Sequence, residues 1–395
     1  MTKARRPAGQ GADEKPSSGW RPPVFVLVLA LLAPLMTSLP AVSAALRQPP
    51  AGKVFLGFPY MVTDHLQYAS FVRQGEAGRL LMEDMFTTEP QRPSFILLYF
   101  GVVGAVVRVT GLAVPLAWEL MRAIGAFGLM LAAWYFTGCF FERKAERILA
   151  YVMIGFSGGL GWLAGLLPED LLKRPGYGFL TDPAHFQWNW STFSSMLVGL
   201  WIPPLLLFLL ASMLLLSRRR MPEALRAAGL FALGPLIWFF HPHGGNVAYF
   251  TIGLFGLMPA FDALWKLEPF PWRKTLGSIG RVLPYLLSFG VVVAYLLWAS
   301  KDAVFAAGGE GAARWNPAYS VFWYPLTYGL LVPLAALGIR WCGSMPERPR
   351  HLVLSWLAAA VILSVNPLFS GVKYQFMVHL PLAVLSAHGI VELRR

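Results

Sequence analysis

Apolar stretches of membrane-crossing length recur along this chain from residue 24 to residue 391. A helix needs about 20 apolar residues to cross the hydrocarbon core of a bilayer. Hydrophobic residues make up 56% of the chain and charged residues only 13%, whereas soluble domains carry about 25% charged residues. The pattern therefore predicts an all-α, polytopic transmembrane helix bundle, and it excludes a soluble globular core.

The hydrophobic pattern predicts about ten spans and one further apolar segment that does not cross. If segment 95–112 crossed, the basic cluster at Arg143, Lys144 and Arg147 would move to the outside. That placement would break the rule that keeps Lys and Arg in the cytoplasm. Segment 95–112 is therefore expected to be embedded in the membrane without crossing. The expected spans are 24–46, 118–141, 147–167, 193–217, 226–241, 246–266, 281–300, 320–341, 351–367 and 375–391.

The basic residues set the expected orientation. The net charge of +13 comes from short clusters between apolar spans, and such clusters mark the cytoplasmic side. With both termini in the cytoplasm, each cluster falls on that side. Residues 1–23 are then a disordered basic tail, 24–391 a single transmembrane domain and 392–395 a short cytoplasmic tail. No basic domain or reading motif indicates nucleic-acid binding.

The N-terminal apolar segment has two interpretations. Val42, Ser43 and Ala44 could form a signal-peptidase site. The segment is also long enough to stay as an uncleaved anchor. Both interpretations deliver residue 47 and those that follow to the outside.

The first extracytoplasmic region, 47–115, is large and contains an expected amphipathic helix. Leu66, Tyr68 and Phe71 are spaced for one face of a helix that would lie on the bilayer plane. Asp64 stands at its start, where an aspartate can cap free backbone N–H groups. The same carboxylate could instead accept a proton from an acceptor hydroxyl or hold a divalent cation, which prefers oxygen ligands.

Three other polar motifs lie at the expected outer ends of spans. In the second outer loop, 168–192, Asp182 and His185 share the spacing of one helix face and could form part of a metal or phosphate site, or of an ordinary polar loop. Lys373 and Tyr374 begin the last span, where the lysine could bind a phosphate or extend its ammonium to the interface. The third motif is His241-Pro242-His243-Gly244-Gly245, for which hydrogen bonding is favoured over metal ligation and whose glycines are expected to leave room for a ligand.

This arrangement resembles the GT-C superfamily of integral-membrane glycosyltransferases, in a poorly characterised bacterial branch. An N-in first span, a long first outer loop with an early aspartate and a second acidic outer loop carry the resemblance. Local strings that add to it are Asp64-His65-Leu66-Gln67-Tyr68, Thr88-Glu89-Pro90, Gly155-Phe156-Ser157-Gly158-Gly159-Leu160-Gly161-Trp162 and Pro381-Leu382-Ala383.

The resemblance implies inverting sugar transfer from a polyprenyl-phosphate donor to an acceptor hydroxyl outside the cytoplasmic membrane of a bacterium. Asp64 would be the catalytic base. Lys373, Tyr374 and His65 would bind the donor phosphate or line the pocket. Asp182 and His185 would hold a divalent cation, Mg²⁺ or Mn²⁺, if one is needed.

The sugar, hexosyl or pentosyl, and the acceptor, a glycan, lipid or protein, stay open. The paired acids of the superfamily's first loop appear here as Asp64 and His65, and this departure weakens the assignment of the base. A transporter or lipid flippase is the alternative, and a non-catalytic membrane scaffold of the same fold is a third. Transporters tend to show internal repeats and charges near the membrane midplane, and neither is evident in this sequence.

Overall fold

Long helices form where the apolar stretches reach the length of a membrane span. The computed structural model describes residues 21–59, 62–94, 97–159, 191–217, 221–308, 324–366 and 371–395. Among these residues, five helical stretches are long and apolar enough to cross a membrane. They are α1 (Val24–Leu46), α4 (Val114–Thr137), α11 (Glu223–Phe240), α12 (Pro242–Trp265) and the stretch Trp272–Ala299, which α13 (Trp272–Leu287) and α14 (Phe289–Ala299) form together.

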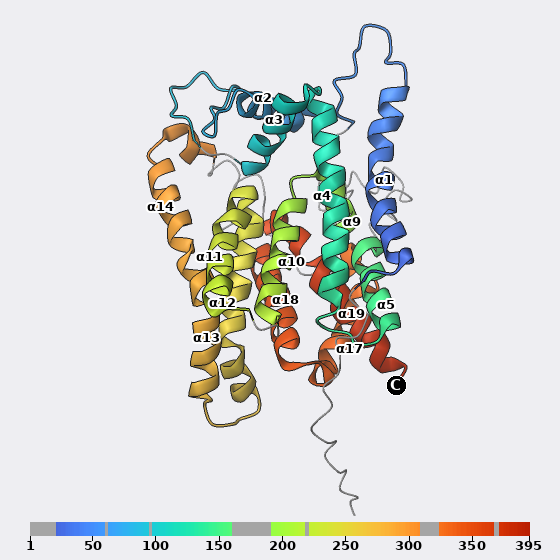
Figure 1. Cartoon of the computed structure of the whole chain (residues 1–395), viewed down its shortest axis with the longest axis vertical. Coiled ribbons are helices and arrows are strands. Elements are labelled where there is room, and N and C mark those ends of the chain that lie inside the picture. Colours follow the sequence, from blue (N-terminus) through green and yellow to red (C-terminus); the bar gives the residue numbers. More distant parts are fainter. Residues whose placement is uncertain are drawn as a thin grey trace, which may run out of the picture.

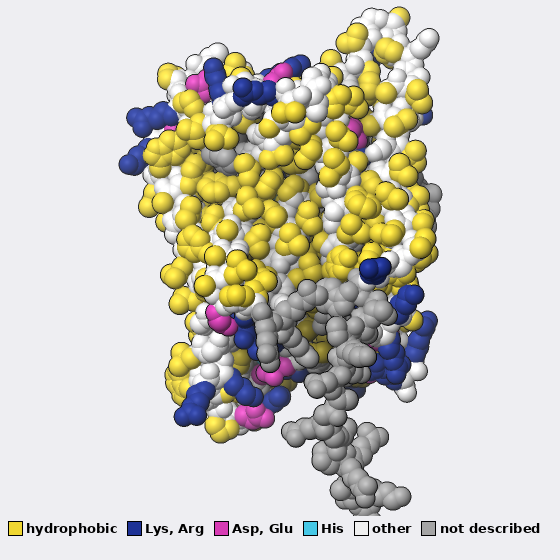
Figure 2. Space-filling model, viewed as in Figure 1, with side chains coloured by type: hydrophobic (Ala, Val, Ile, Leu, Met, Phe, Trp, Pro, Cys, Tyr) yellow, Lys and Arg dark blue, Asp and Glu magenta, His cyan; other side chains and the backbone are white. Residues whose placement is uncertain are grey.

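The surface of the bundle has the pattern of a protein embedded in lipid. Figure 2 shows a hydrophobic band across the middle of the molecule, with charged side chains gathered towards its two ends. In Figure 1, α1 runs upward from the lower half, and the last helix, α19 (His379–Leu393), runs down to the C-terminus. The chain is therefore a multi-pass α-helical membrane protein, as expected. The tail up to residue 20 lies outside the described residues.

Helices α2 (Val62–Glu76) and α3 (Leu98–Thr110) lie together across one end of the bundle (Figure 1), here named the α2–α3 side. At 1.5 Å per residue, the 13 residues of α3 extend about 20 Å, less than the roughly 30 Å hydrocarbon core. This helix is shorter than a full crossing, and the non-crossing position of segment 95–112 stays a prediction. The opposite end, where the chain terminates, is named the C-terminal side.

Close backbone contact holds α2 against α3. A Cβ atom added to Gly104 of α3 would lie 2.5 Å from the backbone nitrogen of Glu76 and 2.6 Å from the carbonyl carbon of Gly75. Small residues at such points let two helices approach closely. The expected apolar face of α2 is buried at Phe71, which is 3% exposed, but Leu66 is 39% exposed and His65, at 2%, is buried in addition.

Several expected spans are broken rather than continuous. The span expected over 147–167 is helical only in α5 (Lys144–Phe156), and its remainder from residue 160 lies outside the described residues. Glycine explains two other breaks. Gly199 has φ +81° between α9 (Thr192–Val198) and α10 (Ile202–Leu216), and Gly329 has φ +54° between α16 (Tyr324–Tyr328) and α17 (Leu331–Arg340). Only glycine adopts such angles without steric cost.

These breaks meet inside the bundle. The His379 ring joins the end of α5 to the start of α9, since its Nδ1 accepts the Thr192 N–H at 3.2 Å and its Nε2 lies 3.1 Å from the Ser157 hydroxyl. The Tyr328 hydroxyl donates to the carbonyl of Gln375 at 3.0 Å. Gln375 belongs to η5 (Gly371–Met377), a 3₁₀ turn between α18 (Glu347–Val365) and α19. Non-helical backbone at membrane depth persists only where protein buries it or where it lines a cavity, and here His379 and Tyr328 bond it within the bundle.

Candidate functional site

Asp64 and Lys373 come from opposite ends of the sequence and meet near the α2–α3 side. Asp64 lies exposed in the first turn of α2, and Lys373 is half-buried in η5. Burial lowers the pKa of Lys373, and attraction to the Asp64 carboxylate opposes that fall. The two side chains form no ion pair among the described contacts.

Asp64 does not cap α2. It is the third residue of that helix, and no hydrogen bond of its carboxylate occurs among the described residues. Its charge also acts on Tyr68, whose pKa is raised by burial first and by Asp64 second. The carboxylate therefore lies on the side of α2 that faces Tyr68 and Lys373, free of a structural partner within the described part of the chain.

His65 lies apart from its neighbour in an aromatic cluster. Its ring stacks on Phe58 with centroids 4.7 Å apart, and it meets the ring of Trp118 at 5.3 Å and that of Tyr68 at 5.7 Å. These contacts join α2 to α4. His65 therefore lies in the aromatic packing beneath Asp64. This packing holds the start of α2, and with it the carboxylate of Asp64, against α4.

The His241-Pro242-His243 turn lies beside Lys373. The Lys373 ammonium acts on both histidines. The ring centroids of His241 and His243 are 5.3 Å apart, and those of His243 and Tyr374 are 5.1 Å apart. In the sequence this turn and Lys373 are separate motifs, and nothing in their spacing indicates that α12 begins next to η5.

Hydrogen bonds fix the start of α12 against η5. Asn246 donates from Nδ2 to the Tyr374 hydroxyl at 3.1 Å, and its Oδ1 accepts the Trp238 indole N–H at 3.1 Å. Since an indole nitrogen only donates, this bond sets the orientation of the Asn246 amide. Tyr374 is 2% exposed, so its hydroxyl serves as an anchor within the site.

The two glycines after His243 leave no room for a ligand, contrary to the expectation from sequence. A Cβ atom on Gly244 would lie 2.7 Å from Pro204 and 3.2 Å from Phe376, and one on Gly245 would lie 2.5 Å from Trp238. Protein atoms fill the space beside both glycines. Their role is to let the start of α12 pack tightly against its neighbours.

The expected metal ligands Asp182 and His185 lie outside the described residues. Among the residues that the structure does describe, no group of three or more His, Cys, Asp and Glu side chains could hold a metal ion. Asp64 has no second carboxylate beside it in that set. A cation at Asp64 would need ligands from outside the described residues.

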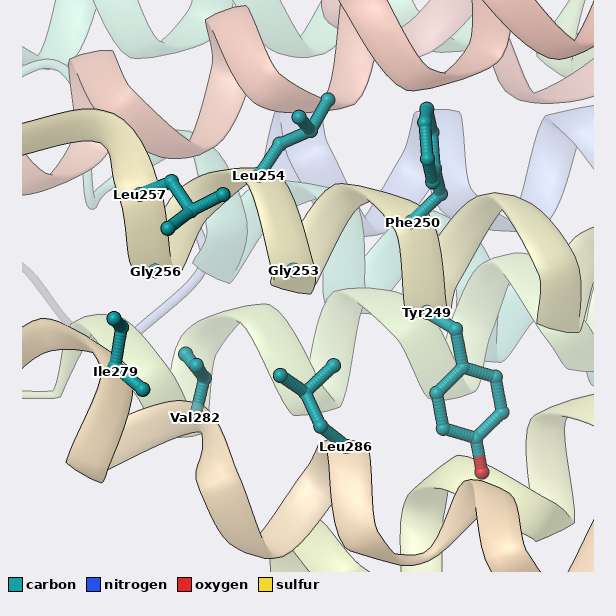
Figure 3. Close-up of a pocket in the computed structure, with 9 residues that line it drawn as sticks. All are labelled: Tyr249, Phe250, Gly253, Leu254, Gly256, Leu257, Ile279, Val282 and Leu286. Carbon is teal, nitrogen blue, oxygen red and sulfur yellow. The ribbon is translucent and has the colours of Figure 1, made fainter. Parts of the chain in front are cut away.

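A cavity of about 350 Å³ lies between α12 and α13. Figure 3 shows Ile279, Val282 and Leu286 of α13 directed towards α12 across it. The Tyr249 hydroxyl at its edge is 2.9 Å from the Ser288 hydroxyl. The lining is apolar, so the cavity suits a hydrocarbon chain and not a sugar. The lining residues are Tyr249, Phe250, Gly253, Leu254, Gly256, Leu257, Ile279, Val282 and Leu286.

Comparison with known proteins supports the fold. The chain is similar in structure to the oligosaccharyltransferase of Archaeoglobus fulgidus, which was crystallised with a tethered acceptor peptide. The TM-score is 0.50 and the sequence identity 17%, over 95% of this chain and 50% of that enzyme, so the chain spans about half its length. This likeness supports a GT-C-like fold. No protein-family model matches the sequence, and no curated protein matches it.

Proposed function

We propose that this chain is a membrane glycosyltransferase that moves a hexosyl or pentosyl group from a polyprenyl-phosphate donor to an acceptor hydroxyl. The observation that carries the proposal is the exposed Asp64 carboxylate on α2, which has no partner among the described residues and whose charge acts on half-buried Lys373. A general base and a phosphate-binding cation are the groups that such a transfer needs. The likeness to an oligosaccharyltransferase supports this class, although a fold alone does not determine chemistry.

In the proposed reaction, the Asp64 carboxylate takes the proton of the acceptor hydroxyl while its oxygen attacks the anomeric carbon of the donor sugar. The bond from that carbon to the phosphate oxygen breaks, and its electron pair leaves with the lipid phosphate. Lys373 stabilises the negative charge that develops there, which is commonly the largest catalytic contribution. Attack opposite the leaving group inverts the anomeric configuration.

The proposal also assigns the membrane side of the reaction and a place for the donor's lipid chain. The α2–α3 side faces away from the cytoplasm, and the membrane is the cytoplasmic membrane of a bacterium. The apolar cavity between α12 and α13 lies along the helix that begins at Pro242, and it suits part of the donor's isoprenoid chain. A Mg²⁺ or Mn²⁺ ion held by Asp182 and His185 stays a prediction, and no step depends on it.

The proposal is tested with Asp64→Asn, which keeps the shape of the side chain and removes its basicity. Transfer from a radiolabelled polyprenyl-phosphate sugar to membrane acceptors is expected to fall by about 100-fold or more. Glu76→Gln is the matched control, because Glu76 lies on the same helix and pairs with exposed Arg73 at 2.7 Å. Unchanged turnover in a folded Asp64→Asn protein would reject the assignment.

A transporter or lipid flippase is the second candidate, because the bundle contains discontinuous helices. Breaks at Gly199 and Gly329 and at the η5–α19 junction resemble the broken helices from which transporters build their binding sites. The two functions differ in product. Reconstituted protein that moves a fluorescent lipid phosphate between leaflets, with no sugar transfer, would favour the second.

A further inference from the structure

The hairpin that joins α12 to α13 exposes large apolar side chains at the C-terminal side (Figure 1). At its end, residues 265–272, here named the hairpin tip, Trp265 is 90% exposed, Leu267 93% and Trp272 66%. The ring centroids of Phe270 and Trp272 lie 4.3 Å apart, so the hairpin tip also carries an aromatic pair. Exposed apolar patches mark surfaces that contact a protein or a membrane.

The length of α12 places the hairpin tip in the headgroup layer of the bilayer. The 24 residues of α12 extend about 36 Å at 1.5 Å per residue. The hydrocarbon core is about 30 Å thick, and the two headgroup layers bring the bilayer to about 40–45 Å. The end of α12 therefore extends past the hydrocarbon but not past the headgroups. Tryptophan is enriched at that level, so lipid is the neighbour that suits the hairpin tip.

One face of α13 carries two arginines with an open space between them. Arg273, Gly277 and Arg281 follow one another at intervals of four residues, so they share this face. A Cβ atom added to Gly277 would meet no atom within 4 Å, and the same holds at Gly280. Neither arginine forms a hydrogen bond or an ion pair among the described residues. This face of α13 can therefore accept a ligand with negative charge.

Further arginines act on Arg281 without enough negative charge to balance them. The charges of Arg226 on α11 and Arg348 on α18 act on the Arg281 guanidinium, and α11 packs against α13. Glu223 acts on it with the opposite sign, but this carboxylate already pairs with Arg226 at 3.2 Å. Three guanidiniums and one carboxylate leave a net positive charge. Like charges repel each other, so a bound anion would stabilise this arrangement.

We propose that α13, together with Arg226 and Arg348, forms a binding site for an anionic phospholipid in the leaflet at the C-terminal side. Arg281 binds the phosphate of the headgroup, since a guanidinium matches phosphate with two parallel hydrogen bonds. Arg273 extends the positive face towards the hairpin tip, where Trp265 contacts the glycerol region of the lipid. Basic pockets between membrane helices hold such headgroups on the cytoplasmic side. The inference goes beyond the proposed function, because this lipid takes no part in sugar transfer.

The test measures binding of dioleoyl phosphatidylglycerol to the delipidated, full-length protein by native mass spectrometry. Arg281→Gln and Arg273→Gln are each expected to weaken this binding by about fivefold, the effect of one basic residue beside anionic lipid. Arg143→Gln is the matched control, because Arg143 is 75% exposed and pairs with Glu146, which also contacts the C-terminal Arg395. Dioleoyl phosphatidylcholine, whose headgroup has no net charge, should bind more weakly and equally to all four proteins.

A second measurement follows the hairpin tip. In a protein with Cys139 and Cys342 changed to Ser, Trp265→Cys is labelled with the fluorophore NBD and reconstituted into dioleoyl phosphatidylglycerol vesicles. A nitroxide attached to the lipid headgroup should quench the fluorescence more strongly than iodide dissolved in the water. Quenching by iodide alone would overturn the placement of the hairpin tip in the bilayer and would favour a soluble protein as its partner.

Each outcome bears on the lipid site by itself, because no sugar donor is present. Weaker binding in both variants with the control unchanged supports the site, even if the protein transfers no sugar and the proposed function fails. Equal binding of phosphatidylglycerol by all four proteins overturns the site, and so does displacement of the lipid by an equal concentration of inorganic phosphate. If Arg281→Gln does not fold, the result for exposed Arg273→Gln decides alone.

Discussion

At the scale of single residues, Arg122 shows how one buried charge joins three helices. Its side chain is fully buried, and its guanidinium donates to Thr37 and Ser38 of α1 at 2.7 and 2.6 Å and to the Met196 carbonyl of α9 at 2.8 Å. The carboxylate of Glu119, one turn away on α4, forms an ion pair with the same guanidinium at 2.8 Å. Charges within a membrane need partners, and the spacing of Glu119 and Arg122 by one turn suits such a pair, whereas no sequence pattern indicates the contacts with α1 and α9.

Arg122→Met is therefore expected to destabilise the protein by about 3 kcal/mol or more, because removing one partner of a buried pair leaves the other uncompensated. Thermal unfolding in detergent, with tryptophan fluorescence as the probe, measures the effect. Arg226→Met is the control, since its partner Glu223 is 89% exposed and such surface pairs contribute about 1 kcal/mol or less. Equal shifts in melting temperature for the two variants would contradict the role given to Arg122.

At the scale of elements, the packing of α2 on α3 positions Asp64. Gly104 leaves no space for even one methyl group against the backbone of Glu76 and Gly75. Gly104→Ala should therefore push the two helices apart, raise amide hydrogen exchange in α2 and lower sugar transfer. Gly101→Ala is a matched control on the same helix, because its nearest contact would be the Met82 side chain at 4.0 Å. An α2 that exchanges equally slowly in both variants would show that this contact is not needed.

At the scale of the whole molecule, the orientation in the membrane is testable. The end of α14 joins the α2–α3 side, where Asp302 accepts the Arg92 N–H at 2.7 Å, while the loop between α12 and α13 lies at the other end of the bundle (Figure 1). In a protein with Cys139 and Cys342 changed to Ser, Lys301→Cys should react with an impermeant maleimide added outside. Lys274→Cys should react only after the membrane is permeabilised. The reverse pattern would invert the proposed topology.

The amino-acid sequence by itself determined the class of the fold. Lipid cannot hydrogen-bond a peptide group, so apolar stretches of the required length must become helices, and hydropathy detects them without knowledge of contacts. The positive-inside rule also placed α3 outside the set of crossing helices. Helix breaks were harder, because Gly199 and Gly329 occur within apolar runs whose average hydropathy hides one left-handed residue.

Only the tertiary structure decided which polar residues share a site. Asp64, His241 and Lys373 are far apart in the chain; η5 packs against α12, and the charge of Asp64 on α2 reaches Lys373. Tertiary packing also separated Asp64 from His65, by burying the imidazole among aromatic rings. The physical reason is range: hydropathy and helix periodicity act over one or two turns, whereas a binding site depends on contacts between helices that no local pattern records.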